Sequence, residues 1–304
     1  TTDYPSGRFS AIIAENGGRE NAFTGRDYTA YYQFMGNDRL EISFKLEADR
    51  MRNLSLPEDG FKKELEVVKE ERFMRTEDKP EALTYERFNA TAYFNSPYHH
   101  PIIGWMEDLD SLKIENLRAW YDAWYQPNNA TLVVVGDVEP EAVLKLAKKH
   151  FGPIAPGKIT PVKPRLETPQ RGERRVHVKA TAKVPYTMIG YPVPVLNTAE
   201  VDWEPYALDV LSSILDGGDS SRLTRNLVRG QEIASSASAS YNLSNRYQSL
   251  LMLTGAPAHG KNIAEVEKAL LAEVEKLRTA LVSNAELERV KASVIASDTY
   301  QLDS

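Results

Sequence analysis

A proline- and glycine-rich stretch in the middle of the chain limits what it can fold into. Residues 152–174 contain five prolines and three glycines and show no hydrophobic periodicity. Such a stretch connects regular elements rather than extending them. The 304 residues are also about twice the usual size of one domain. We therefore predict an N-terminal domain over residues 1–151 that lacks its first elements, a linker over 152–174, and an incomplete C-terminal domain over 175–304.

Strands and amphipathic helices are mixed on both sides of this linker. Strands are predicted from β-branched and aromatic runs at residues 20–24, 28–34, 131–136, 175–179, 186–191, 235–241 and 250–254. Helices are predicted from apolar spacing and capping residues at 7–15, 39–54, 57–75, 83–93, 114–124, 140–150, 205–215, 221–228, 263–281 and 285–302. This order favours an α+β fold of two similar domains, each a mainly antiparallel sheet with helices packed on one side.

The composition excludes several classes of function. The chain has no cysteine, so disulfides, cysteine-type zinc sites and thiol catalysis are excluded within it. The net charge of −6 arises from 43 acidic and 37 basic residues without a long block of either sign, which argues against a nucleic-acid partner. No run of 18 apolar residues is present, so we predict no membrane span.

Both ends of the sequence look cut. The chain starts at Thr1 without an initiator methionine or a signal-type region. At the other end, Ser304 follows a helical pattern that stops without a glycine, asparagine or proline signal. We expect further residues on both sides.

The predicted helix over residues 57–75 carries the most informative acidic residues. Glu64 and Glu71 lie on the same face as Val67 and Val68. Carboxylates that share a face with apolar residues are expected to be buried, and burial requires a metal, a cation or a hydrogen-bond network. A solvated acidic helix is the competing interpretation, and the spacing alone favours it.

A second candidate is the predicted strand that contains Asn21, Ala22, Phe23 and Thr24. An exposed strand edge with small residues can receive an extended peptide as an added strand, bound through backbone hydrogen bonds. Taken alone, this strand is better interpreted as part of a surface hairpin.

Other features that attract attention favour structural roles. His99 and His100 are adjacent in a proline-flanked loop, and adjacent residues of an extended chain point to opposite sides, so we expect them not to share one metal ion. The glycine turn at residues 217–218 follows a helix and has no lysine at the position that phosphate-binding loops require, which predicts a tight turn between helices.

Several motifs, in order over nearly the whole chain, resemble those of pitrilysin/insulinase-type zinc peptidases, the M16 or processing-peptidase family. In the first half they are Gly17-Gly18-x-x-Asn21-Ala22-Phe23-Thr24, Leu46-Glu47-Ala48-Asp49-Arg50-Met51, Glu64-x-x-Val67-Val68-x-Glu70-Glu71, His100-Pro101-x-x-Gly104, Tyr125-x-Pro127-x-Asn129 and Val134-Val135-Gly136-Asp137-Val138. In the second half they are Gly190-Tyr191-x-x-Pro194 and Gly218-x-Ser220-Ser221-Arg222-Leu223.

The resemblance implies a zinc-dependent endopeptidase subunit that hydrolyses peptides or unfolded polypeptides through a metal-activated water. Such enzymes bind Zn²⁺ through an inverted His-x-x-Glu-His motif and a downstream glutamate. The resemblance assigns Glu71 as that metal ligand, Glu64 as the supporting acid among the catalytic residues, and Asn21, Ala22 and Phe23 as the substrate-binding strand. It puts the nearer histidine about five residues before Thr1. We therefore expect the 304 residues alone to bind no zinc and to be inactive.

One departure from the family pattern concerns the second half. Active halves of that type carry an arginine and, seven residues later, a tyrosine that contact the substrate; here Arg229 is followed by Ser235 and Ser236. The departure implies a homologous partner subunit that supplies this pair, in a heterodimer. The alternative is a non-catalytic scaffold or assembly subunit of the same fold. Overall resemblance to exported bacterial proteins favours the periplasm, with the cytoplasm as the alternative.

Overall fold

The computed structural model describes residues 1–301, which fall into two compact units. The first unit comprises Thr1–Phe73 and Pro101–Pro164, and the second begins with Met74–His100 and continues from Arg165. The sequence-based division assigned residues 74–100 to the N-terminal domain, whereas their contacts lie with the second unit. The domain boundaries at 151 and 174 stay a prediction.

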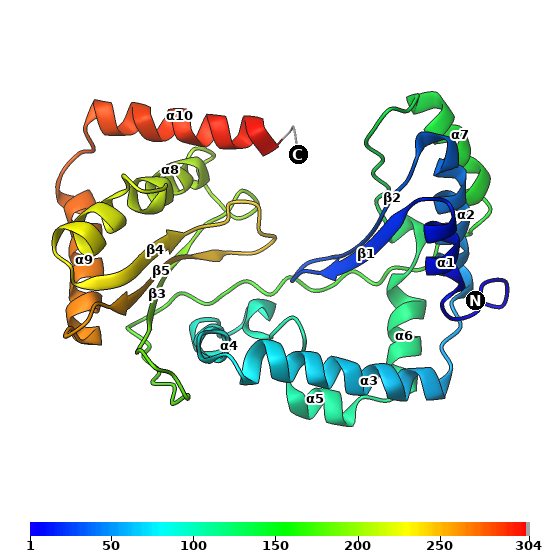
Figure 1. The fold of residues 1–304 in the computed structure, drawn as a ribbon, viewed down its shortest axis with the longest axis horizontal. Coiled ribbons are helices and arrows are strands. Elements are labelled where there is room, and N and C mark those ends of the chain that lie inside the picture. The colour runs from blue at the N-terminus through cyan, green and yellow to red at the C-terminus, as the bar shows by residue number, and fades with distance from the viewer. Residues whose placement is uncertain (302–304) are drawn as a thin grey trace. The chain divides into compact units, whose positions relative to one another are not determined.

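The first unit consists of helices around one antiparallel hairpin (Figure 1). Its elements are α1 (Arg8–Glu15), β1 (Arg19–Thr24), β2 (Thr29–Phe34), α2 (Leu40–Asn53), α3 (Glu58–Arg72), α5 (Met106–Ser111), α6 (Ile114–Trp124) and α7 (Pro140–His150). Strands β1 and β2 pair in register from Arg19 opposite Phe34 to Thr24 opposite Thr29. The buried side chains Ile13, Phe44 and Leu46 show that α1 and α2 form the core beside this hairpin.

The second unit contains a three-stranded antiparallel sheet in the order β3-β5-β4. Its elements are α4 (Pro80–Ala92), β3 (Thr187–Val193), α8 (Glu204–Asp216), β4 (Ala234–Ser240), β5 (Ser249–Pro257), α9 (Ile263–Thr279) and α10 (Asn284–Gln301). Helices α8 and α9 pack on the sheet, and α10 packs on α8 (Figure 1). The α+β fold predicted from the sequence is therefore confirmed.

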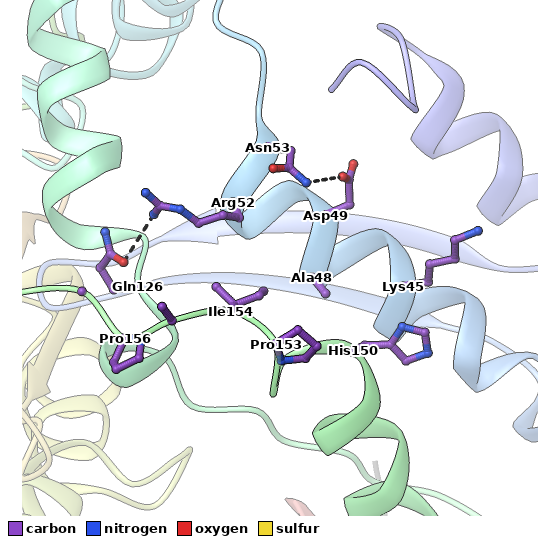
Figure 2. A pocket seen from close by; sticks show the side chains of 12 residues that line it. Lys45, Ala48, Asp49, Arg52, Asn53, Gln126, His150, Pro153, Ile154 and Pro156 are labelled. Atoms are coloured by element: carbon purple, nitrogen blue, oxygen red, sulfur yellow. Dashed lines mark hydrogen bonds between the residues drawn. The ribbon is translucent and has the colours of Figure 1, made fainter.

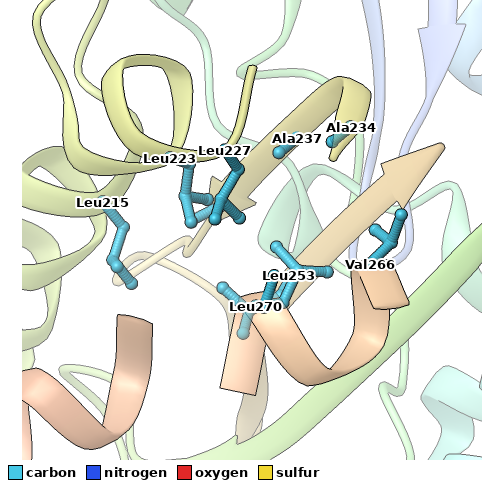
Figure 3. Close-up of a cluster of buried hydrophobic side chains, with 10 residues drawn as sticks. Leu215, Leu223, Leu227, Ala234, Ala237, Leu253, Val266 and Leu270 are labelled. Carbon is cyan, nitrogen blue, oxygen red and sulfur yellow. The ribbon is translucent and has the colours of Figure 1, made fainter. Parts of the chain in front are cut away.

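The core of the second unit follows from the alternation of side chains in β4 and β5. Ala237 and Ala239 are buried whereas the serines between and beside them are exposed, as expected for a strand with one covered face. Figure 3 shows the cluster of buried hydrophobic side chains that forms this core. Leu253 of β5 meets Leu270 of α9 in its centre, and both side chains are fully buried. On the opposite face of the sheet, Gly190 leaves room for Phe88 of α4, since an added Cβ would lie 2.8 Å from the Phe88 ring.

Two predicted strands are wrong. Residues 131–136 were predicted as a buried strand, but they form no regular element, and Val133 and Val135 are 74% and 91% exposed. Residues 175–179 are likewise irregular, with Arg175 paired to Glu267 of α9 through hydrogen bonds of 2.9 Å and shorter. A strand needs a hydrogen-bonding neighbour, and none of the five strands described in residues 1–301 pairs with either segment.

The C-terminal part of the linker is bound to the end of α4 and to the segment that follows it. Glu167 Oε2 accepts hydrogen bonds from the backbone N–H groups of Phe94, Asn95 and Ser96 at 2.9–3.0 Å. Arg174 donates to the carbonyl oxygens of Thr91 and Ala92, where a cation is favourable at a helix C-terminus. Burial by itself would raise the pKa of Glu167, but the backbone hydrogen bonds outweigh it and hold that pKa below its usual value.

These bonds make a pH-dependent contribution to stability. The lowered pKa means that the stabilisation is complete above the unfolded-state pKa of about 4.3 and is lost as the pH falls through the folded-state value. We expect Glu167→Ala to lower the unfolding free energy by about 1–2 kcal/mol at pH 7, with a smaller difference from wild type near pH 3. Denaturant unfolding at both pH values measures this, and Glu200→Ala, an exposed site, is the control. An equal loss at both pH values would contradict the role of the charge.

Candidate functional site

Helix α3 carries the two glutamates that sequence analysis singled out. It starts after Pro57 with Glu58 and Asp59 in its first turn, where negative charge is favourable. Glu64 and Glu71 are two turns apart and so lie on one side of this helix. The structure therefore brings them to the same flank of α3.

The expectation that these two glutamates are buried is wrong for Glu64. Glu64 is exposed, Glu71 is partly buried, and the neighbouring Val67 is 56% exposed. Another side of α3 is packed against the rest of the unit. The last residue of the helix on that side, Arg72, is fully buried and donates to Gly104 O at 2.7 Å. Lys69 on that side pairs with Asp110 of α5 at 3.0 Å. Glu64 and Val67 thus lie on an exposed part of the helix surface.

Glu64 also borders an apolar pocket of about 680 Å³ within the first unit. The pocket lies among the start of the chain and helices α2, α3, α5 and α6. Its apolar lining includes Leu46, Leu65, Val68, Leu109 and Leu117. Asp49 and Arg50 join Glu64 as its charged members. A carboxylate beside an apolar pocket is placed to pair with a cation.

The second candidate feature, strand β1, has one edge open. Among the strands of residues 1–301, β1 pairs only with β2. Asn21, Ala22 and Phe23 are all exposed, and Asn21 Oδ1 accepts the Ala22 N–H at 2.8 Å. The side chain of Asn21 thus occupies a backbone donor that an added strand could use.

A polar network anchors the hairpin to α2. Gln33 of β2 donates to Glu47 Oε1 at 2.6 Å, and Arg50 forms an ion pair with the same carboxylate. The Arg50 guanidinium lies 3.6 Å from the ring centre of Tyr31, close enough for cation–π attraction. The Tyr31 hydroxyl bonds that of Tyr125, whose pKa is raised by burial and by this neighbour. Sequence analysis gave Glu47, Arg50 and Tyr125 no role, although each lies in a motif that carried the family resemblance.

A second, more polar pocket of about 550 Å³ lies beside α2 (Figure 2). Lys45, Asp49 and Arg52 of α2 line one wall, and residues 153–157 line the other. Arg52 donates to Gln126 at 3.3 Å, and Asn53 donates to Asp49 at 2.8 Å. Asp49 of α2 borders both pockets.

The histidine pair has a different geometry from the one predicted. The His99 and His100 rings lie 3.9 Å apart, so the prediction that they point to opposite sides is wrong. A tight 3₁₀ turn over Pro97–His99 replaces the extended backbone that the prediction assumed. Burial, and then the adjacent His100, lower the pKa of His99.

The second unit contains the residues that depart from the expected arginine–tyrosine pair. Arg229 pairs with Asp219 at 3.2 Å, and both side chains are exposed. Ser235 lies on the exposed side of β4. The glycine turn that follows α8 is tight. Gly218 in this turn has φ +105°, a backbone conformation that favours glycine.

Within residues 1–301, no three histidine, cysteine, aspartate or glutamate side chains gather closely enough to hold a metal ion. Among the helices of this part of the chain, none combines the length and apolar character needed to cross a bilayer.

Comparison with known proteins identifies the family. Residues 1–105 match the family model described as insulinase (peptidase family M16), and residues 111–294 match the M16 inactive domain. The zinc protease PqqE of Helicobacter pylori is 33% identical over the whole chain, which covers 68% of that protein. The zinc protease YmxG of Bacillus subtilis, described as uncharacterized, is 28% identical over 95% of the chain and 68% of its own length.

Solved structures agree with the sequence relatives. The crystal structure of a protease from Helicobacter pylori has a TM-score of 0.92 and 33% identity, over 99% of this chain and 73% of that one. The first half of the periplasmic protease PqqL from Escherichia coli shares the fold, with a TM-score of 0.76 at 21% identity over 100% of this chain and 66% of that one. The architecture is thus that of the two-domain M16 peptidases. This chain belongs to peptidase family M16, as the motifs in its sequence indicated.

The anchoring network predicts a specific loss of order in the hairpin. Glu47→Ala removes the acceptor for both Gln33 and Arg50, and we expect the hairpin to lose about 1–2 kcal/mol of local stability. Hydrogen exchange of the β1 and β2 amides measures this loss. Glu41→Ala on the same helix is the matched control, because Glu41 bonds Lys149 and His150 instead. Unchanged exchange in Glu47→Ala would show that the network does not hold the hairpin.

Proposed function

We propose that this chain is part of a zinc-dependent endopeptidase that hydrolyses peptides or unfolded polypeptides. The observation that carries the proposal is that Glu64 and Glu71 lie on one side of α3, with Glu64 bordering an apolar pocket. The naming of relatives as zinc proteases supports Zn²⁺ as the metal.

In this proposal Glu71 is the metal ligand and Glu64 is the acid that supports the site. The remaining ligands, two histidines in the family pattern, come from polypeptide that is not among these 304 residues. When bound, Zn²⁺ supplies an activated water for peptide hydrolysis. The role of this chain's own residues is to hold the ion on α3 and to bind the substrate backbone along Asn21, Ala22 and Phe23.

The metal assignment is tested in a protein that also carries the histidine motif. Glu71→Gln replaces a carboxylate ligand by a neutral amide, which is a poor zinc ligand, so we expect a severe loss of zinc affinity with the fold intact. Glu64→Gln should weaken binding or activity about 10–100-fold, as changes next to a ligand typically do. Zinc titration followed by calorimetry measures both. Wild-type affinity in Glu71→Gln would remove Glu71 from the site.

A non-catalytic scaffold subunit is the second candidate, and two observations favour it. The second half matches the family's inactive domain, and Arg229 is followed by serines on β4 and is paired with Asp219. The presence of both Glu64 and Glu71 on one side of α3 favours the peptidase, because a scaffold does not need the two acids of a metal site. The two candidates differ in whether the Glu71→Gln change affects metal binding.

We further propose that a homologous partner subunit completes the enzyme. The partner would carry the arginine–tyrosine pair that Arg229 and Ser235 do not supply. The expected result is that the zinc-loaded chain cleaves an unfolded polypeptide slowly alone and faster after the partner is added. Peptidase assays over a range of partner concentrations measure this dependence. Full turnover of the single chain, unchanged by any homologous subunit, would contradict it.

We also propose a periplasmic location, with the cytoplasm as the alternative. The support is the Escherichia coli protein PqqL, which shares the fold and is described as periplasmic. The absence of cysteine is compatible with either compartment.

A further inference from the structure

One face of the β1–β2 hairpin carries a row of exposed aromatic side chains. Phe23, Tyr28 and Phe34 are 49%, 63% and 54% exposed, and Tyr32 lies between them. The ring centres of Phe23 and Tyr28 are 5.6 Å apart, those of Phe23 and Tyr32 6.5 Å, and those of Tyr32 and Phe34 5.6 Å. Four aromatic rings in contact form an apolar patch of a kind that is unusual on a solvent-exposed surface. Such a patch indicates a binding surface.

A single cation lies at one end of this row. The Arg19 guanidinium carbon is 4.5 Å from the ring centre of Phe34, and the residue is exposed. No carboxylate within residues 1–301 forms an ion pair with Arg19. Arg19 and Phe23 are four residues apart on β1, so their side chains lie on the same face of the strand. The face is therefore aromatic along its length and carries a positive charge at its Arg19 end.

The hydrogen-bond pattern shows which backbone groups of β1 are available. Gly25 donates to Tyr28 O at 2.8 Å and closes the turn. Because bonded and non-bonded pairs alternate in an antiparallel ladder, the N–H groups of Phe23 and Asn21 face β2, and those of Ala22 and Glu20 face the open edge. The Asn21 side chain bonds the Ala22 N–H, which agrees with this assignment.

We propose that this edge selects extended peptides in which an aromatic residue is followed, four positions later, by an acidic residue. A peptide added antiparallel to β1 places one side chain opposite Phe23 and the side chain four positions later opposite Arg19. The aromatic side chain packs on the Phe23 ring, which the Tyr28 and Tyr32 rings contact from the side of β2. The acidic side chain pairs with Arg19. This selection rests on the proposed function of β1 as the substrate strand.

A second copy of the chain fits this edge less well. The outer face of β1 carries Arg19, Asn21 and Phe23, so pairing β1 with β1 offers Arg19 no carboxylate. A separate peptide with an acidic residue supplies the missing charge.

The test is peptide binding to the 304-residue chain without metal, so that it does not depend on catalysis. Short fluorescein-labelled peptides differ only in having Phe or Ala at one position and Glu or Lys four positions later. Fluorescence anisotropy should show tightest binding for the Phe/Glu peptide, with a loss of roughly two- to tenfold on changing Glu to Lys. Arg19→Glu should reverse the preference to Phe/Lys, and Phe23→Ala should remove the preference for Phe over Ala.

Lys145→Glu on α7 is the matched control, since it changes an exposed lysine by the same charge away from β1. It should keep the wild-type order of peptides. A Glu-over-Lys preference that survives Arg19→Glu, or no binding of any peptide to the wild type, overturns the proposal. Self-association that blocks peptide binding, seen by sedimentation, also overturns it. Peptide selection with no zinc-dependent activity in the complete protein would instead refute only the proposed function.

Discussion

The carboxylate of Glu47 is the contact on which the candidate substrate strand depends. A two-stranded hairpin is marginally stable on its own, and here β2 is held to α2 by Gln33 and by Arg50 stacked on Tyr31, both of which bond Glu47. The same helix borders the two pockets of the first unit. Helix α2 thus links the position of the hairpin edge to the shape of the hollow next to Glu64.

Other parts of the first unit contact only one face of the hairpin, so the other face is the one available for binding. Its inner face is occupied by Gln33, Tyr31 and Glu20, which contact α2, Tyr125 and Ser10 of α1. Its outer face and the outer edge of β1 have no such partners in residues 1–301. Exposed aromatic area and an open strand edge both favour the binding of another chain. A strand-like peptide can cover both at once.

The sequence predicted those parts of the fold that local patterns determine. The helix over residues 114–124 and the strand pair around Asn21 and Tyr31 were found because spacing and β-propensity act within a short segment. Residues 131–136 have the same strand-like composition, yet no strand pairs with them, and pairing cannot be read from one segment. The exposure of Glu64 was missed for a similar reason, because helical spacing identifies a shared face but not what covers it. The anchoring role of Glu47 depends on Gln33, which lies on another element of the fold.

The contacts of α4 have a consequence for the covalent continuity of the molecule. Residues 74–100 precede the linker in sequence but pack with the second unit, where Glu167 binds the backbone at residues 94–96. A cut in the exposed backbone between Gly157 and Pro164 breaks only one of the crossings between the units. The N-terminal fragment would still contain α4. Because α4 packs on β3, this fragment would stay bound to the C-terminal fragment. A nicked chain of this kind behaves as a non-covalent complex of two interlocked pieces, so loss of the linker bond and loss of assembly are separate events.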